Sequence, residues 1–279
     1  MSRRKKFPSE SVPTKDLVAH LRKVSVIRQR WVDRRNWTSR GDEKALWYRG
    51  QSNAEWGLVP SRWRKSFARE LESEMRLEFE SVGRQLVSAD SQRDKWGWYF
   101  LMAHYGAPTR LLDWTINPLV ALYFAVDSND PSVDGAVWVI DPWEWNKIHI
   151  RGLYGPALPG WKETEPYLWD LESAMDTDNA DIRRKWPIAI EPPHIDRRIA
   201  AQEGRFILFG TARDLVGSPN VNRRTKKGRR ARLDKIVIPG KSKATIRDEL
   251  DRLGINEKTL FPDLGGLGRY IRWKWSGFE

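Results

Sequence analysis

Cysteine is absent from this chain of 279 residues, and histidine is rare, with only four residues. The absence of cysteine excludes disulfide bonds and thiolate-bound zinc. The histidines stand at positions 20, 104, 149 and 194, too far apart to form a pattern of metal ligands, and no His-Glu-x-x-His run occurs. We therefore expect no metal cofactor, and a metal-dependent nuclease is the weakest of the functions considered.

Long apolar runs and the usual nucleotide-binding glycine loops are also missing. No stretch approaches the roughly 18 consecutive apolar residues that a membrane span needs. The basic start at residues 1–6 is not followed by the apolar run of a secretory signal. We expect a cytoplasmic protein of bacterial or phage origin with no membrane partner. Gly265–Gly268 is the only glycine-rich stretch of note, and because it follows no strand we predict a turn there.

Positive charge is abundant, with a formal net charge of +12, and so is tryptophan, with 16 residues. Most of the tryptophans should lie in the core, because each buries a large apolar surface. The charge suits a polyanionic partner such as nucleic acid. It is densest in a predicted mobile loop, 222–232, where seven of eleven residues are basic. The residues expected to contact nucleic acid are Arg223, Arg224, Lys226, Lys227, Arg229 and Arg230. The alternative is a solvated loop that only keeps the protein soluble.

Hydrophobic periodicity predicts one α+β domain over 15–279, preceded by a basic flexible tail at 1–14. Its central sheet should be mixed or antiparallel and covered by helices. Residues 141–186 show no clear period and are expected to form an insertion or long loop. The predicted helices cover 15–38, 67–86, 96–105, 118–126, 195–201 and 246–253, and 260–275 is predicted to form a final turn and helix. The predicted strands cover 45–51, 111–115, 135–140, 188–190, 205–209 and 233–238.

The segment 103–115 combines imidazole, hydroxyl, guanidinium, carboxyl and indole groups around Gly106 and Pro108. It leads into Asn117-Pro118, which is typical of a helix start with an N-cap asparagine. Binding and catalytic groups are often presented at such loop-to-helix junctions. One interpretation is therefore a functional site. The other is a buried Arg110–Asp113 ion pair with Trp114 as packing.

Three separated motifs resemble the FRG domain, named for its Phe/Tyr-Arg-Gly signature. The first is Trp47-Tyr48-Arg49-Gly50-Gln51 with 58–61, and the second is 104–115 with Asn117-Pro118 and 121–125. The third comprises Arg198, Gln202, Gly204 and Phe206, followed by 261–264. The resemblance covers a core of about residues 40–270. It departs from the signature only in having Tyr48 where phenylalanine is usual.

The arrangement also bears a distant resemblance to ADP-ribosyltransferase-like folds, which bind NAD. That resemblance implies an early strand presenting Arg49, a second strand with Asp113 leading into a helix, and a later strand opened by Gln202. These three would be the catalytic residues of an enzyme using NAD as its substrate, with a protein or a nucleic acid as acceptor. The implied ligand-binding residues are Tyr48, Gln51, Ser61, His104, Tyr105, Thr109, Arg110, Trp114, Thr115 and Arg198. The expected late glutamate is missing, because Gly204 stands two residues after Gln202, while Glu203 should face the other way.

Two further alternatives stay open. Asp113 or Glu191 could supply the missing carboxylate, or Arg49 could be a structural residue buried against Asp113 or Glu55. The competing function is a non-catalytic nucleic-acid-binding protein, or an accessory protein in phage defence, that uses the basic loop. The enzyme hypothesis requires that Arg49, Asp113 and Gln202 line a single cleft.

Overall fold

A computed structural model describes residues 14–32, 46–64, 72–87, 93–128, 130–169, 186–192, 197–218, 221 and 231–276. The predicted tail up to residue 13 lies outside these ranges. So do all six residues of the basic loop predicted to contact nucleic acid. Within the described ranges, no helix combines the length and the apolarity needed to cross a membrane.

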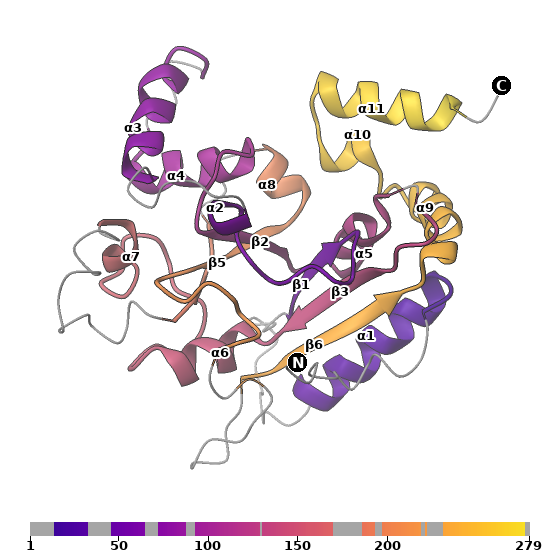
Figure 1. Ribbon diagram of the computed structural model, residues 1–279, viewed down its shortest axis with the longest axis horizontal. Coiled ribbons are helices and arrows are strands. Elements are labelled where there is room, and N and C mark those ends of the chain that lie inside the picture. Colours follow the sequence, from indigo (N-terminus) through magenta and orange to yellow (C-terminus); the bar gives the residue numbers. More distant parts are fainter. Residues whose placement is uncertain are drawn as a thin grey trace.

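One six-stranded antiparallel sheet forms the centre of the fold, with the order β4-β5-β2-β1-β3-β6 (Figure 1). The predicted α+β class is confirmed. Its strands are β1 (Trp47–Gln51), β2 (Leu111–Thr115), β3 (Gly135–Ile140), β4 (Ile188–Ile190), β5 (Gly204–Leu208) and β6 (Leu233–Ile238).

The two central strands β1 and β2 are joined by a single register pair, Tyr48 with Thr115. Strand β1 makes five such pairs with β3, and β2 makes five with β5. The sheet therefore opens beyond Tyr48 and Thr115. Arg49 on one strand and Asp113 on the other lie at this opening.

Helices lie around the sheet on several sides (Figure 1). Their bounds are α1 (Leu17–Val32), α2 (Ser61–Arg64), α3 (Glu72–Gly83), α4 (Lys95–His104), α5 (Pro118–Val126), α6 (Pro142–His149), α7 (Glu165–Trp169), α8 (Arg197–Ala201), α9 (Lys243–Arg252), α10 (Glu257–Leu260) and α11 (Leu264–Trp275).

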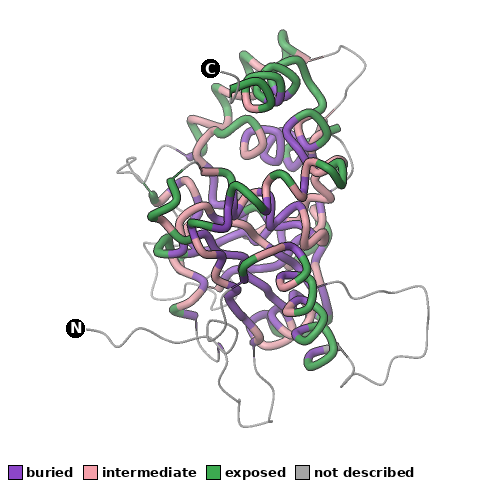
Figure 2. Tube along the Cα trace, turned by 90° about the vertical axis from the view of Figure 1, so that its right-hand side faces the viewer, coloured by how far each residue is buried: buried purple, intermediate pink, exposed green. Residues whose placement is uncertain are grey.

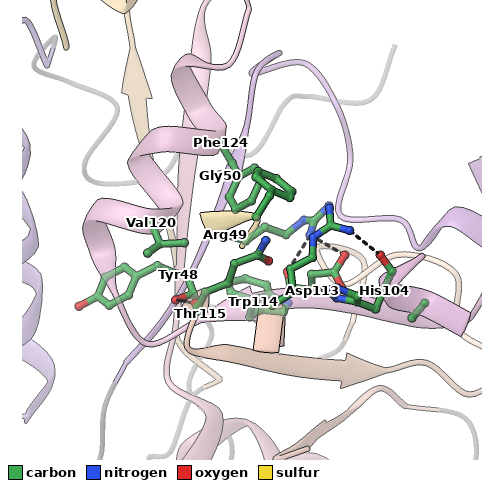
Figure 3. Close-up of a pocket in the computed structure, with 13 residues that line it drawn as sticks. Tyr48, Arg49, Gly50, His104, Asp113, Trp114, Thr115, Val120 and Phe124 are labelled. Atoms are coloured by element: carbon green, nitrogen blue, oxygen red, sulfur yellow. Dashed lines mark hydrogen bonds and ion pairs between the residues drawn. The ribbon is translucent and has the colours of Figure 1, made fainter. Parts of the chain in front are cut away.

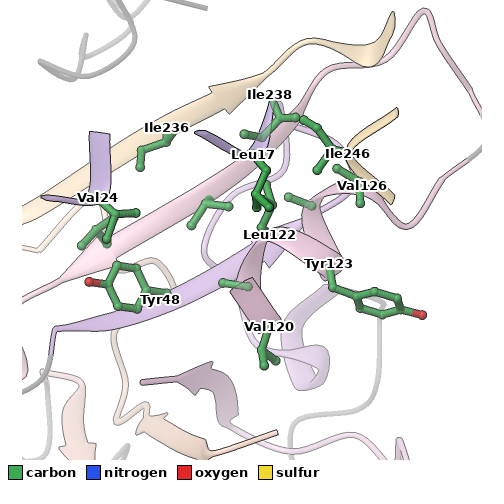
Figure 4. Close-up of a cluster of buried hydrophobic side chains, with 14 of the residues drawn as sticks. Leu17, Val24, Tyr48, Val120, Leu122, Tyr123, Val126, Ile236, Ile238 and Ile246 are labelled. Atoms are coloured by element: carbon green, nitrogen blue, oxygen red, sulfur yellow. The ribbon is translucent and has the colours of Figure 1, made fainter. Parts of the chain in front are cut away.

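Helix α5 lies directly against the sheet. Asn117 caps its first turn, with its side chain accepting from Leu119 N at 3.0 Å, and Pro118 takes the first helical position, as predicted. Helix and strand approach closely because β1 carries Gly50 there: a Cβ at this position would lie 1.9 Å from the carbonyl oxygen of Ala121. Leu122 and Val126 of α5 then pack in a cluster with residues of α1, β3, β6 and α9 (Figure 4).

The opposite face of the sheet carries a tryptophan-rich cluster. Trp47, Trp114, Trp138 and Trp145 are all at most 3% exposed and pack together with apolar residues of β5 and β6. Figure 2 shows that buried segments in general concentrate at the centre of the molecule. For these four residues, the expectation of a tryptophan-rich core is confirmed.

Two stretches that were predicted to be irregular, 141–186 and Gly265–Gly268, contain helical residues. The segment expected as an insertion or long loop begins with α6, whose N-cap Asp141 accepts from Glu144 N, and its described residues also contain α7. The predicted turn at Gly265–Gly268 lies inside α11. The glycine there permits close packing, since a Cβ at Gly266 would meet the carbonyl oxygen of Phe261 at 1.9 Å.

Candidate functional site

A pocket of about 230 Å³ opens where β1 and β2 separate (Figure 3). Its walls come from β1, β2, α5, the end of α4, the segment around α8, and the residue after α10. The lining residues are Tyr48, Arg49, Gly50, Ala103, His104, Asp113, Trp114, Thr115, Val120, Phe124, Arg198, Gln202 and Phe261. Arg49, Asp113 and Gln202, three residues distant in sequence, thus lie around one pocket, as the enzyme hypothesis requires. Their catalytic roles stay predictions.

Arg49 spans the opening between the two central strands. One terminal nitrogen, Nη1, donates to the main-chain oxygen of Asp113 at 2.6 Å and lies 3.7 Å from the carboxylate oxygen Oδ2 of the same residue. The Arg49 side chain is 13% exposed and that of Asp113 is 65% exposed. Within the described residues, the buried Nε of Arg49 has no hydrogen-bond partner. The guanidinium is thus largely removed from water but only partly satisfied by the protein.

Burial lowers the pKa of the Arg49 guanidinium to about 10, an effect that Asp113 opposes and the nearby positive charge of Arg64 increases. Arg49 therefore remains charged at neutral pH, at a place where its own charge is disfavoured. An anion in the pocket would relieve that cost.

Arg198 brings a second guanidinium to the same pocket. Its Nη1 donates to the main-chain oxygen of His104 at 3.5 Å, and the group lies 4.3 Å from the ring centre of Phe261. Phe261 meets Phe124 edge-on, with ring centres 6.1 Å apart. The pocket thus combines two cations, one exposed carboxylate and an aromatic wall.

Gln202 and Thr115 are fixed at the pocket edge by hydrogen bonds to main-chain oxygens. The Gln202 amide nitrogen donates to Leu260 O at 3.0 Å, and the Thr115 hydroxyl donates to Gln202 O at 2.7 Å. The next residue, Glu203, has a positive φ of 49° and accepts from the Asn117 amide at 2.8 Å. Glu203 therefore holds the N-cap residue of α5 and is not among the residues that line the pocket.

The predicted Arg110–Asp113 ion pair is wrong. Arg110 is buried and pairs with Glu72 at the start of α3, with Nε 2.6 Å from Oε2. Its other nitrogens donate to the main-chain oxygens of Phe209 and Tyr167. The acidic residues Glu72, Glu74, Glu78 and Glu80 of the predicted helix 67–86 suggest a solvated face. Glu72 is instead 8% exposed and also accepts from the Tyr99 hydroxyl at 2.5 Å. Arg110 therefore has a structural setting away from the pocket.

Four other predicted ligand-binding residues also lie away from the pocket. Gln51 is 4% exposed, accepts from Trp138 Nε1 at 2.7 Å and donates to Gly57 O at 3.1 Å. Ser61 and Thr109 are joined by two hydrogen bonds, in which the Ser61 hydroxyl accepts from Thr109 N and donates to Thr109 O. Tyr105 lines a separate apolar groove beside α3. Only Tyr48, His104, Trp114, Thr115 and Arg198 of the predicted ligand-binding set line the pocket.

Five lining residues were missed from sequence: Gly50, Ala103, Val120, Phe124 and Phe261. Four are adjacent to predicted residues or belong to the helix that follows 111–115. Phe261 stands in one of the quoted motifs, so the motif itself was the signal that could have found it. No group of three or more His, Asp or Glu side chains in the described ranges is arranged to hold a metal ion.

Comparison with known proteins identifies one family. The family model of the FRG domain matches residues 44–133, about a third of the chain, which include β1, β2 and α5. No curated protein and no solved structure matches the chain. Arg198, Gln202 and Phe261 lie beyond the matched residues, although they line the same pocket. The resemblance seen in the sequence is confirmed for residues 44–133, which hold the first two of the three motifs and match the FRG domain, and the third motif lies outside the match.

Proposed function

We propose that the pocket binds NAD and that the chain is an ADP-ribosyltransferase-like enzyme that cleaves the bond between nicotinamide and ribose. The observation that carries the proposal is the position of Arg49. This cation, 13% exposed and with a buried Nε, is only partly satisfied by the protein and faces a pocket that holds a second cation. Buried charges are normally paired and fully hydrogen-bonded. An anionic ligand in the pocket would supply the hydrogen-bond acceptor that Arg49 lacks.

The chemistry needs the groups that the pocket brings together. Arg49 and Arg198 would bind the diphosphate, because guanidinium groups bind phosphate oxygens through two parallel hydrogen bonds. When the glycosidic bond breaks, nicotinamide leaves with the bonding electron pair and positive charge develops on the ribose. The exposed carboxylate of Asp113 would stabilise that charge until a nucleophile of the acceptor forms the new bond to the ribose carbon. Phe124 and Phe261 offer apolar contact to a ring.

The size of the pocket limits how NAD would sit. At about 230 Å³ it is smaller than the roughly 300–1,000 Å³ of pockets that enclose drug-sized ligands. It would hold one part of the dinucleotide, with the remainder over the open mouth. Affinity should then depend on the phosphates more than on the two rings.

The direct test is nicotinamide release from labelled NAD with cell lysate as acceptor source, together with calorimetric titration of NAD and ADP-ribose. We expect wild type to bind both ligands and to release nicotinamide. Asp113→Asn should bind without release, because it keeps the Arg49 hydrogen bond to the main chain and loses the carboxylate. Arg49→Lys should weaken binding, and Arg151→Ala, which removes an exposed arginine away from the pocket, should change nothing. Absence of binding by wild type would refute the proposal.

The competing proposal, nucleic-acid binding through the basic loop 223–232, is supported by the sequence charge of +12. Neutralising several phosphates makes affinity fall steeply with salt. Replacing the six loop residues predicted to contact nucleic acid by alanine should flatten the salt dependence of RNA or DNA binding. An unchanged slope would exclude the loop as the contact surface.

A further inference from the structure

Helix α11 presents an apolar stripe to solvent. Leu264, Leu267, Ile271 and Trp275 are between 42% and 87% exposed. Their spacing of three to four residues places them along one side of the helix. In Figure 1, α11 lies at the edge of the molecule, away from the sheet. Contiguous exposed apolar surface of this kind marks interaction sites.

The orientation of α11 is fixed by its opposite side. Tyr270 is 8% exposed, and Gly266 lies against the main chain of Phe261. The ring of Trp273 lies 5.1 Å from the guanidinium carbon of Arg247 on α9. The apolar stripe therefore cannot turn inward without breaking these contacts.

A second apolar surface lies beside α3. A groove of about 500 Å³ runs between α3 and the end of α4. Several of its residues are solvent-exposed, among them Val82 at 55% and Leu86 at 82%. Its lining residues are Met75, Glu78, Phe79, Val82, Gly83, Leu86, Val87, Leu101, Met102, Tyr105, Ala107 and Pro108. Apolar grooves of this form commonly accept the apolar face of a helix.

Charge and length make the two surfaces complementary. Among the described residues that line the groove, Glu78 is the only charged one. The segment 264–275 contains no acidic residue, and Arg272 and Lys274 lie among its exposed positions. Both α3 and α11 have 12 residues, which corresponds to about 18 Å each. A basic helix with an apolar stripe thus complements an apolar groove that bears an acidic group and runs beside a helix of the same length.

We propose that α11 of one copy of this chain docks in the groove between α3 and α4 of a second copy. The two surfaces are well separated within one molecule, α3 at the upper left and α11 at the upper right of Figure 1. Each copy therefore offers both a helix and a groove, and the contact is head-to-tail. Such contacts produce rings or open chains instead of a closed symmetric pair. A second copy covers both exposed apolar surfaces at once, whereas a membrane or another protein on α11 would leave the groove open.

The test is sedimentation of the full chain from low to high micromolar concentration, since one helix in one groove is a small interface. Wild type should form larger species as its concentration rises. Ile271→Glu on α11 and Leu86→Glu in the groove should each weaken association at least about tenfold, because each places a charge where an apolar side chain is covered. Leu253→Glu, at a 57% exposed position on neither surface, is the matched control and should associate like wild type.

Mixing the two variants gives the decisive result. The Leu86→Glu protein keeps an intact helix and the Ile271→Glu protein keeps an intact groove, so the mixture should form one-to-one dimers and nothing larger. Melting temperatures of the variants establish that both are folded. A monomeric wild type, a mixture that stays monomeric, or a Leu86→Glu protein that still associates would overturn the proposal. Binding of monomeric wild type to anionic vesicles, lost in Ile271→Glu, would assign α11 to a membrane surface instead.

Discussion

Arg49 and Arg110 are both arginines from the motifs that resemble the FRG domain and both are largely removed from water, yet their surroundings differ. Arg110 lies 2.6 Å from the carboxylate of Glu72, with the two side chains only 5% and 11% exposed. Arg49 lies 3.7 Å from the carboxylate of Asp113, and that partner is 65% exposed. The guanidinium of Arg110 also donates to two main-chain oxygens from distant segments, Phe209 and Tyr167.

The difference teaches how a structural arginine can be distinguished from a candidate ligand-binding one. In the buried Arg110–Glu72 pair every guanidinium nitrogen already donates to the protein, which leaves little capacity for a ligand. A buried guanidinium with an unsatisfied nitrogen, beside a pocket, retains that capacity. Burial alone does not separate the two cases, whereas the exposure of the partner carboxylate does.

The largest expected effect comes from Arg110→Ala. This change leaves the Glu72 carboxylate buried with the Tyr99 hydroxyl but without its cation, so we expect a loss of about 3–5 kcal/mol in the free energy of unfolding. Urea denaturation measures it. Arg110→Met together with Glu72→Leu, which removes both charges, should recover much of the loss. A loss below about 1 kcal/mol for the single variant would show that the pair is not structural.

His20 extends the comparison of Arg49 with Arg110 to a titratable side chain that is buried in its neutral form. Its Nε2 donates to Pro118 O at 3.3 Å, and burial lowers its pKa from 6.5 to about 4. The unfolded chain therefore binds the extra proton between pH 6.5 and 4, and stability is lost as the pH falls through that window. The loss should reach about 3 kcal/mol. We expect denaturation curves of His20→Gln to show a smaller fall than wild type, while His104→Gln, a change at the pocket, should retain the wild-type fall.

The smallest expected effect on stability comes from Arg49→Ala. The variant loses one hydrogen bond to a main-chain oxygen and one pair with an exposed carboxylate, together about 1 kcal/mol. Affinity for ADP-ribose should fall at least about tenfold, because hydrogen bonds to a charged group contribute about 1.5–3 kcal/mol. Urea denaturation and calorimetric titration of the same sample check both. Loss of stability comparable to that of Arg110→Ala, with unchanged affinity, would make Arg49 a structural residue.

Local signals in the sequence predicted the elements that build the pocket. Asn117-Pro118 predicted the start of α5, and the short apolar runs predicted β1, β2 and β5 close to their observed bounds. The prediction of these elements depends on N-cap chemistry, proline geometry and hydrophobic pattern, all of which act over a few residues. The meeting of Arg49, Asp113 and Gln202 around one pocket was implied instead by the resemblance to ADP-ribosyltransferase-like folds.

The errors concern contacts between distant residues. The partner of Arg110 is Glu72, 38 residues earlier in the chain. Helical periodicity placed Glu72 on a solvated face, because a periodic pattern cannot show that a carboxylate turns toward a neighbouring strand. Likewise, Gly266 suggests a turn when considered alone. The close approach of Phe261 O, a tertiary contact, explains why glycine occupies a helix there.

The close packing of β1 on α5 has a consequence for how any ligand is recognised. A side chain even as small as that of alanine at position 50 would collide with the main chain of Ala121, so any substitution there must push α5 away from β1. Because both elements line the pocket, that displacement would change the wall that a ligand contacts. The shape of the pocket therefore depends on a position that contributes no side-chain atom.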